Sequence, residues 1–379
     1  MGEPVRVALR SLSLTNFRNY AQLTIALDGQ LIAFVGENGA GKTNLLEAVS
    51  LLTAGRGLRR APLDEIGLKG SAAPWSVAAR VSGVAEETRI GVGHTPGEPG
   101  RRIRIDGADA RTSDQLLDYL RVLWLLPSMD GLFTGPAGDR RRFLDRLVLA
   151  VDPGHGRRVA DLEKALRARN RLLDQGGGPA YLDAVEAQLA PLAVAVSLAR
   201  RETVALLVDR IALQAGLGLP FPRADVALTG AFEDEAAALP ACDLEDRYLA
   251  ALAAGRGRDR AAGRTLEGPH RSDLAVRHVA KDMPAALAST GEQKALLIGL
   301  VLAHAEVTAA TAGMTPVLLL DEVAAHLDPG RRRALFTRLA DLGLQVLMTG
   351  TDPQLFVDLP AESRLMAVAN GAVSVYNDT

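Results

Sequence analysis

The spacing of hydrophobic and polar positions divides the chain into a β-rich part and a helical part. Between residues 5 and 125, short apolar or alternating runs are separated by turn residues, and the expected strands are 5–14, 22–27, 31–35, 75–84 and 102–105. From residue 136 to residue 253 the apolar positions recur at helical spacing, and the expected helices are 140–149, 157–173, 181–215 and 244–253. Residues 216–239 are predicted to form a loop-rich connection between helices.

Strand character returns in the last third of the chain, at 274–279, 317–320, 345–348 and 365–368. The sequence therefore predicts an α/β fold whose head is split in the sequence. Residues 1–130 and 262–379 are expected to form this head, and residues 131–261 an inserted helical lobe. Glycines and prolines interrupt the inserted helices. These helices therefore cannot form a long heptad-repeat arm, and we expect a compact lobe.

The first candidate site is a glycine-rich loop, Gly36-Glu37-Asn38-Gly39-Ala40-Gly41-Lys42-Thr43, followed by Asn44. It matches G-x-x-x-x-G-K-[ST] between an apolar run and a helical pattern, which is the strand, phosphate loop and helix order that gives this motif its meaning. Backbone N–H groups of such a loop surround phosphate oxygens, and the following helix adds its positive N-terminal end. We expect Lys42 to reach the β- and γ-phosphates of ATP and the Thr43 hydroxyl to bind Mg²⁺.

A second motif places two carboxylates at the end of a predicted buried strand. Residues 317–320 are apolar, and Asp321 and Glu322 follow directly. Ligands bind at the carboxyl ends of parallel strands, so Asp321 is expected to hold Mg²⁺ through water and Glu322 to act as general base on the attacking water. The structural alternative is a pair of acids that merely end a strand and cap the next helix.

A third motif, Ser289-Thr290-Gly291-Glu292-Gln293-Lys294, precedes an apolar helical segment. Alone it is an ordinary helix N-cap with an acid in the first turn. Placed after a P-loop and before an Asp-Glu strand, it resembles the signature motif of the ABC and SMC ATPase superfamily. That resemblance implies an ATP-bound homodimer in which Ser289 and Gly291 cover the γ-phosphate held by the other subunit. It also implies that Asp328 lies at the same seam, and that Thr349 or Thr351 stands where ABC proteins place a switch histidine.

Composition and charge limit the remaining possibilities. The chain has 379 residues and one cysteine, Cys242, which excludes an internal disulfide framework and fits a reducing cytoplasm. The start lacks an apolar signal core, and the run 295–303 is far below the roughly 18 residues that span a bilayer, so we expect no membrane association. With a net charge of −2, any contact to nucleic acid must come from local patches. The candidates are Arg56, Arg59, Arg60 and Arg141.

The order of several further segments resembles the RecF family of bacterial recombination-repair ATPases over nearly the whole chain. These segments are 15–20 (Thr-Asn-Phe-Arg-Asn-Tyr), 55–60 (Gly-Arg-Gly-Leu-Arg-Arg), 140–145 (Arg-Arg-Arg-Phe-Leu-Asp) and 268–274 (Gly-Pro-His-Arg-Ser-Asp-Leu). The resemblance implies an ABC/SMC-type P-loop ATPase head of mixed sheet and helices with an inserted compact α-helical lobe. It further implies a cytoplasmic protein whose ATP-bound dimer binds double-stranded DNA at gaps and promotes recombinase loading with a RecR-type mediator, and whose hydrolysis of ATP resets the dimer.

Two alternatives from other classes stay open at this point. One is an ABC-type ATPase subunit coupled to a different partner, which a Q-loop glutamine would favour. No convincing glutamine is found near residues 127–130, where Asp130 is a candidate substitute. The other is a nucleotide-dependent scaffold that binds ATP with negligible turnover.

Overall fold

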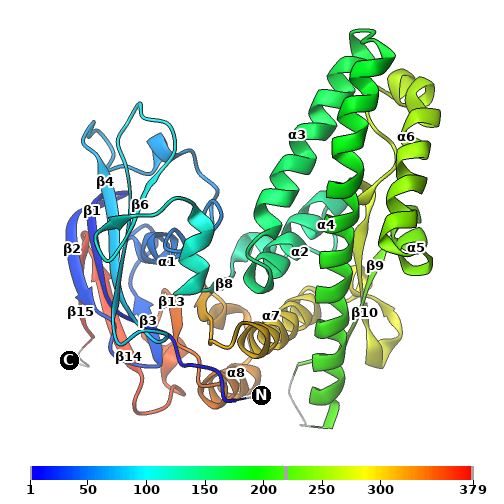
Figure 1. Cartoon of the computed structure of the whole chain (residues 1–379). Helices are drawn as coiled ribbons and strands as arrows, with labels where there is room; N and C mark the ends of the chain where they lie inside the picture. The colour runs from blue at the N-terminus through cyan, green and yellow to red at the C-terminus, as the bar shows by residue number, and fades with distance from the viewer. Residues whose placement is uncertain (1, 217–220, 377–379) are drawn as a thin grey trace. The chain divides into compact units, whose positions relative to one another are not determined.

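The computed structural model describes residues 2–216 and 221–376 and divides them into two compact units. The first unit comprises residues 1–130, 214–222 and 289–379, and the second comprises residues 131–213 and 223–288. The predicted α/β class, with a mixed-sheet head and an inserted lobe, is confirmed. Figure 1 labels the elements of both units.

One sheet of the first unit is antiparallel throughout, in the strand order β2-β1-β4-β5-β6-β7. Its strands are β1 (Ala8–Phe17), β2 (Tyr20–Ala26), β4 (Trp75–Ser82), β5 (Thr88–His94), β6 (Arg102–Ile105) and β7 (Ala108–Asp109). Buried and exposed residues alternate along β4 and β5, as expected for a sheet with one face on the core and the other toward solvent.

The second sheet of this unit has the order β15-β14-β3-β13-β12-β8 and is parallel except for β15. Its strands are β3 (Leu31–Val35), β8 (Val122–Leu125), β12 (Val317–Leu320), β13 (Val346–Gly350), β14 (Arg364–Ala369) and β15 (Ala372–Val375). Every residue of β3, β8, β12 and β13 is buried, which explains their continuous apolar sequences. The strands nearest the phosphate loop therefore come from both ends of the chain.

Three α-helices complete the first unit: α1 (Lys42–Ser50), α7 (Thr290–Ala312) and α8 (Pro329–Asp341). Helix α1 contacts β1 of one sheet and β13 of the other, and α7 contacts β8. Short 3₁₀ turns are η1 (Leu63–Glu65), η2 (Ser113–Asp118), η3 (Pro127–Met129), η4 (Gln214–Gly216), η8 (Ala324–His326) and η9 (Pro353–Phe356).

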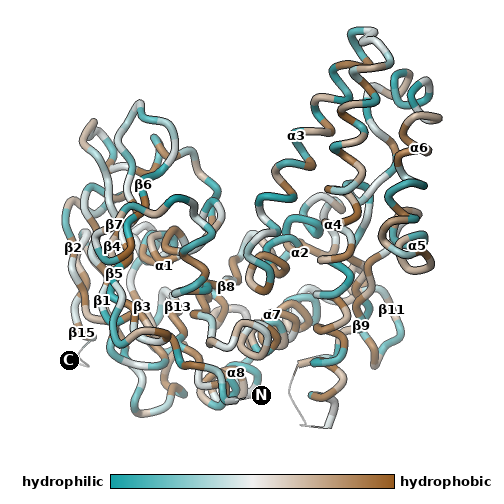
Figure 2. The backbone as a smooth tube through the Cα atoms, viewed as in Figure 1, coloured by the Kyte–Doolittle hydropathy of each residue, from teal (hydrophilic) through white to brown (hydrophobic). Residues whose placement is uncertain are grey.

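The second unit contains α2 (Ala137–Val151), α3 (His155–Asp174), α4 (Pro179–Leu213), α5 (Ala231–Ala238) and α6 (Ala241–Ala262). Figure 2 shows hydrophilic and hydrophobic residues alternating along α3, whose apolar side packs on α4 and α6. The unit also holds a sheet of order β11-β10-β9, built from β9 (Ala224–Thr229), β10 (Asp273–His278) and β11 (Met283–Pro284). Its 3₁₀ turns are η5 (Pro269–Arg271), η6 (Val279–Lys281) and η7 (Ala285–Leu287).

One sequence-based expectation for this region is wrong. Residues 216–239 are not a loop-rich connection, because β9 and α5 lie there; residues 217–220 are outside the described part. The predicted strand 274–279 exists as β10, but it pairs with β9 rather than with the head sheets. This pairing groups residues 262–288 with the helices, whereas the sequence-based division assigned them to the head. The division into domains itself stays a prediction.

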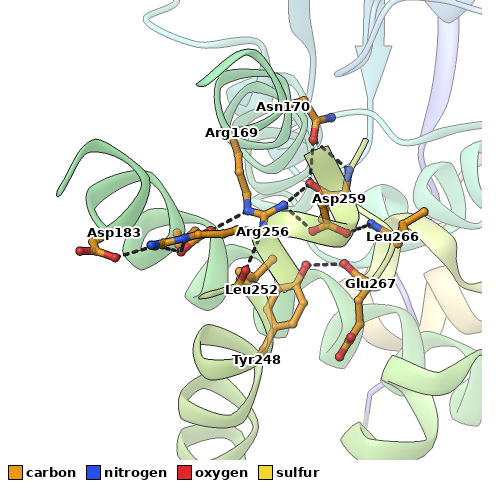
Figure 3. Close-up of polar contacts among 11 residues, drawn as sticks. Arg169, Asn170, Asp183, Tyr248, Leu252, Arg256, Asp259, Leu266 and Glu267 are labelled. Atoms are coloured by element: carbon orange, nitrogen blue, oxygen red, sulfur yellow. Dashed lines mark hydrogen bonds and ion pairs between the residues drawn. The ribbon is translucent and has the colours of Figure 1, made fainter. Parts of the chain in front are cut away.

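A buried polar network joins three helices of the second unit (Figure 3). The Arg169 guanidinium is fully buried and donates to Glu186 Oε1 on α4 at 2.8 Å and to Asp259 Oδ2 on α6 at 2.7 Å. Its remaining donors reach Thr265 Oγ1 and the Leu252 carbonyl, each at 2.8 Å. The charge of Arg169 is thus compensated by two carboxylates that are themselves buried, which fixes α3, α4 and α6 against one another.

Helices α4 and α7 are both long and apolar enough to cross a membrane by length and composition. The apolar stretch of α7 is longer than the run 295–303 considered above, but 72% of its most apolar 18-residue segment is buried inside the protein. For α4 the buried share is 44%. Core helices of soluble proteins pass the same test, so length and composition alone assign neither helix to a membrane.

Candidate active site

The predicted phosphate loop connects β3 to α1, and at two of its glycines a side chain would collide with neighbouring atoms. Gly41 has φ +112°, and a Cβ atom there would lie 2.5 Å from Asn19 Nδ2. A Cβ atom on Gly36 would lie 2.2 Å from the Val368 carbonyl oxygen. The chain therefore packs closely against the loop at Gly36 and Gly41, where glycine fits without displacing a neighbour.

Residues before β2 hold this loop in place. Asn19 Nδ2 donates to the Ala40 carbonyl at 3.1 Å, and Asn19 Oδ1 accepts from Asn44 Nδ2 at 2.8 Å. The Tyr20 hydroxyl donates to the Gly41 carbonyl at 3.1 Å, and burial raises its pKa, so it remains a donor. The sequence pattern marked 15–20 as a family segment but did not indicate that Asn19 and Tyr20 support the loop.

Lys42 lies over the loop. Its Nζ donates to the carbonyls of Gly36 at 2.7 Å and Glu37 at 3.0 Å, and it lies 3.7 Å from Glu322 Oε1. The lysine is only 5% exposed, so its charge is directed into the loop rather than into solvent. An entering phosphate would meet this ammonium group, as the sequence predicts.

The strand order brings Asp321 to the loop. Strand β13 lies between β3 and β12 and runs parallel to both. The carboxyl ends of all three strands therefore lie at the same edge of the sheet. Asp321 Oδ1 accepts from Thr43 Oγ1 at 2.8 Å and from Thr349 Oγ1 at 2.7 Å, and Asp321 is 6% exposed. The carboxylate and the Thr43 hydroxyl thus form a pair of hard oxygen groups, which fits Mg²⁺ held by few protein ligands together with waters and phosphate. Asp321 faces the phosphate-loop helix and does not cap the next helix.

Glu322 has φ +53°, a conformation that non-glycine residues rarely adopt. Its N–H donates to Thr349 Oγ1 at 3.0 Å. A single hydroxyl therefore positions both acids: it donates to Asp321 and accepts from the backbone of Glu322. Thr351, the other threonine of this segment, is exposed, so the structure distinguishes two residues that the sequence could not.

Replacing Thr349 with valine is expected to lower Mg²⁺-dependent ATP hydrolysis by about 10- to 100-fold, because groups that orient metal-binding residues have effects of this size. The methyl group keeps the packing but removes both hydrogen bonds. A Mg²⁺ titration of turnover measures the effect. Thr351→Val is the matched control and should behave as wild type; equal loss in both variants would contradict a specific role for Thr349.

The signature serine is exposed at the N-cap of α7. Ser289 Oγ donates to Glu292 Oε2 at 2.9 Å, and the same oxygen accepts from Ser289 N at 3.1 Å, forming a capping box. A Cβ atom on Gly291 would meet nothing within 4 Å. Both residues therefore border open space, an arrangement compatible with a ligand from another subunit. Their roles in trans stay predictions.

Asp328 and Asp130 have partners within their own unit. Asp328 caps α8, where its Oδ1 accepts from Arg331 N at 2.9 Å, and its side chain is 57% exposed. Asp130 Oδ2 lies 3.2 Å from Lys294 Nζ of the signature helix, and Lys294 is buried. The seam role of Asp328 and the Q-loop role of Asp130 stay predictions.

The arginines selected from the sequence differ in their surroundings. Arg59 Nη1 donates to Asn44 Oδ1 at 2.7 Å and also pairs with Glu47, a carboxylate that is 2% exposed and that Arg18 contacts as well. Arg59 thus supports α1 although its side chain is exposed, as are those of Arg56 and Arg60. Arg141 belongs to the other unit and donates to the Ser272 carbonyl at 2.6 Å. Burial lowers the pKa of Arg141, and repulsion from Arg200 and Arg271 lowers it further. Contact of these arginines with DNA stays a prediction.

This combination of a phosphate loop, strand-end acids and a signature serine exposed at the start of a buried helix defines an ATP-binding head of SMC type. In agreement, the family model described as the RecF/RecN/SMC N terminal domain matches residues 8–374. Within that class the chain belongs to the RecF family of DNA replication and repair proteins.

The relatives cover the whole chain. The DNA replication and repair protein RecF of Mesorhizobium japonicum is 55% identical over 378 residues, which cover 99% of this chain and all of the relative. A solved structure of the recombination mediator protein RecF-ATPrS in the RecFOR pathway has a TM-score of 0.87 at 21% identity and covers 100% of both chains. A second structure, of RecF-ATP in the same pathway, has a TM-score of 0.83 at 22% identity and covers 98% of this chain and 100% of that one. At these identities the two structures establish the fold.

Proposed function

We propose that this protein is a cytoplasmic ATP-dependent DNA-binding protein of recombinational repair, and that its ATP-bound homodimer binds duplex DNA at gaps. In this proposal it promotes recombinase loading with a RecR-type mediator, and ATP hydrolysis resets the dimer. One set of hydrogen bonds carries the ATP-dependent part of the proposal. Asp321 accepts from both Thr43 and Thr349, and Thr349 accepts from the backbone of Glu322, so the phosphate loop is joined to both strand-end acids. The names of the RecF relatives support the repair role.

Each residue has a defined task in this mechanism. The loop N–H groups and Lys42 bind and orient the phosphates, and Thr43 with Asp321 would hold Mg²⁺. Held by Thr43 and Asp321, Mg²⁺ would supply positive charge next to the phosphates, which would neutralise negative charge that develops during transfer. Glu322, which is 23% exposed and 3.7 Å from Lys42, accepts a proton from the attacking water. Ser289 and Gly291 of a second subunit close the site over the γ-phosphate, so turnover depends on dimerisation.

The test is duplex binding with Mg²⁺-ATP and with Mg²⁺-ADP over a range of salt concentrations. We expect at least about 10-fold tighter binding with ATP and a marked decrease in affinity with salt, because phosphate contacts release counterions. Lys42→Ala should lose the ATP effect and keep the ADP level of binding. Equal binding with both nucleotides would refute ATP control, and no duplex binding in either state would refute the repair role in favour of an ATPase subunit with another partner.

A further inference from the structure

The outer face of the antiparallel sheet has an unusual cross-strand composition. Residues that point away from the core form rows across neighbouring strands, and the register places one such row on five strands, β2, β1, β4, β5 and β6. Figure 1 shows these strands in blue to cyan. The row consists of Thr24, Ser13, Ala78, Gly91 and Arg104. Its members are small except at the β6 end, so the surface lacks side chains that would keep a large ligand away from the sheet.

This row forms the floor of a trough. A concavity of about 650 Å³ opens above Ser76, Ala78, Gly91 and Gly93, with Arg102 and Arg104 on its side. A second concavity of about 370 Å³ shares Ala78, Gly91 and Arg104 with the first and continues over Ser11, Ser13 and Thr24. The two together cross the five strands of this row, which span roughly 19 Å at the usual strand spacing.

Arginines line this trough, and two of them stand directly opposite each other. Arg80 on β4 pairs in register with Arg89 on β5, an arrangement of like charges that destabilises an antiparallel ladder. Arg80 is only partly compensated, because Glu87 lies 3.8 Å away and both side chains are about half exposed. Among the residues that the structure describes, the side chains of Arg89 and Arg102 have no hydrogen bond or ion pair. An anion bridging these guanidinium groups would relieve the repulsion.

The chemistry of the trough favours one type of anionic polymer. A protein partner draws its affinity mainly from buried apolar and aromatic anchors, and single-stranded nucleic acid from aromatic stacking. No large exposed hydrophobic residue of the described chain lines the trough. The trough presents guanidinium groups and hydroxyls, such as those of Ser13 and Thr24, which are the donors that contact phosphodiester oxygens without reading sequence. Its lining also includes Glu98 and Asp109, and Asp109 pairs with Arg104 at 3.1 Å, so Arg80, Arg89 and Arg102 are the arginines most available to an anion.

We propose that this outer face binds the phosphate backbone of duplex DNA, through Arg80, Arg89, Arg102 and Arg104. The small residues of the floor allow the backbone to approach the sheet, and the arginines on either side contact its phosphates. The inference rests on the proposed function, in that it assigns a surface to the duplex. It places that surface on residues other than Arg56, Arg59, Arg60 and Arg141.

The test compares two double variants of the full-length protein that change the charge equally. Arg89→Ser/Arg102→Ser removes the two arginines that lack partners, and Arg333→Ser/Arg364→Ser removes two exposed arginines from another part of the same unit. Duplex binding with Mg²⁺-ATP is measured by fluorescence anisotropy between 50 and 200 mM salt. The first variant should bind on the order of 10-fold more weakly and flatten the slope of log K against log salt by about 1.8, since each phosphate contact contributes about 0.9. The control should keep the wild-type slope, and both variants should bind ATP like wild type.

A third variant tests the proposal in the opposite direction. Glu87→Gln removes the carboxylate nearest Arg80 and should tighten duplex binding by about 3-fold, since it removes a competitor for the guanidinium group. Wild-type affinity and slope in Arg89→Ser/Arg102→Ser would overturn this surface while leaving the ATP-dependent duplex binding of the wild type intact. If Arg89→Ser/Arg102→Ser lost binding to a polyglutamate peptide while its duplex binding was unchanged, the proposed DNA surface would also be overturned. The face would then be assigned to an acidic protein. Absence of duplex binding by the wild type would instead refute the proposed function, and this inference with it.

Discussion

The Glu322→Gln protein is expected to bind ATP normally and to hydrolyse it at least about 100-fold more slowly than wild type, because a positioned general base contributes 10²- to 10⁴-fold. The amide keeps the size of the side chain but cannot take a proton from water. The Thr349 contact is to the backbone N–H of Glu322, so it is preserved and the loop keeps its conformation. With hydrolysis blocked, light scattering should find a dimer with Mg²⁺-ATP and a monomer with Mg²⁺-ADP.

Glu362→Gln, the same chemical change at an exposed carboxylate of the same unit, is the control and should hydrolyse ATP like wild type. Retained turnover in Glu322→Gln would mean that another group activates the water. A monomer with ATP, even when duplex DNA is added, would contradict the role of Ser289 in trans. If the wild type shows no turnover and Glu322→Gln supports repair in cells, the protein is a nucleotide-dependent scaffold.

Arg169→Ala is expected to destabilise the second unit by about 3–5 kcal/mol, because removing one partner of a buried ion pair leaves uncompensated charge. Two carboxylates are affected. Asp259 loses its guanidinium partner, while Glu186 retains Arg256, whose Nε lies 3.2 Å from both of its oxygens. Urea unfolding followed by circular dichroism measures the loss of stability.

Arg167→Ala provides the matched control for this measurement. Arg167 lies on the same helix, is 66% exposed and forms an exposed pair with Glu163 at 3.6 Å. Such pairs contribute about 0–1 kcal/mol, so Arg167→Ala should leave the urea midpoint nearly unchanged. A similarly small effect in Arg169→Ala would show that the network of Figure 3 does not determine the stability of the unit.

The strands beside the nucleotide site could be predicted because each is marked by its own short stretch of sequence. The strands β3 and β12 are buried on both faces, so each reads as an uninterrupted apolar run followed by a chemically distinctive segment. Strand β9 was missed because it is stabilised by pairing with β10, whose residues lie 44 to 54 positions later in the chain. Propensity within a short window cannot reveal a partner at that separation.

The candidate site shows the same limit at the level of single residues. Lys42, Thr43, Asp321 and Glu322 were identified because residue type and motif spacing are sufficient to indicate them. The contact of Thr349 with Asp321 depends on β13 lying between β3 and β12, a strand order that periodicity does not contain. Arg59 was interpreted as a DNA contact because its sequence neighbours are basic, and that contact stays a prediction. Its pairing with Glu47, which precedes it by twelve residues on a buried helix face, was not predicted.

The strand order of the parallel sheet also has a consequence for biosynthesis. Strands β3 and β8 are both made early, but β13 and β12 separate them in the finished sheet. Thr43 and Asp321 are 278 residues apart, so at ribosomal rates of about 5–20 residues per second the first waits roughly 14 to 56 s for the second. During this interval β3 and β8 present apolar edges with no neighbouring strand. A chain released before β13 is complete therefore carries a phosphate loop on an unpaired strand, and full-length translation is a condition for both a closed nucleotide site and protection from aggregation.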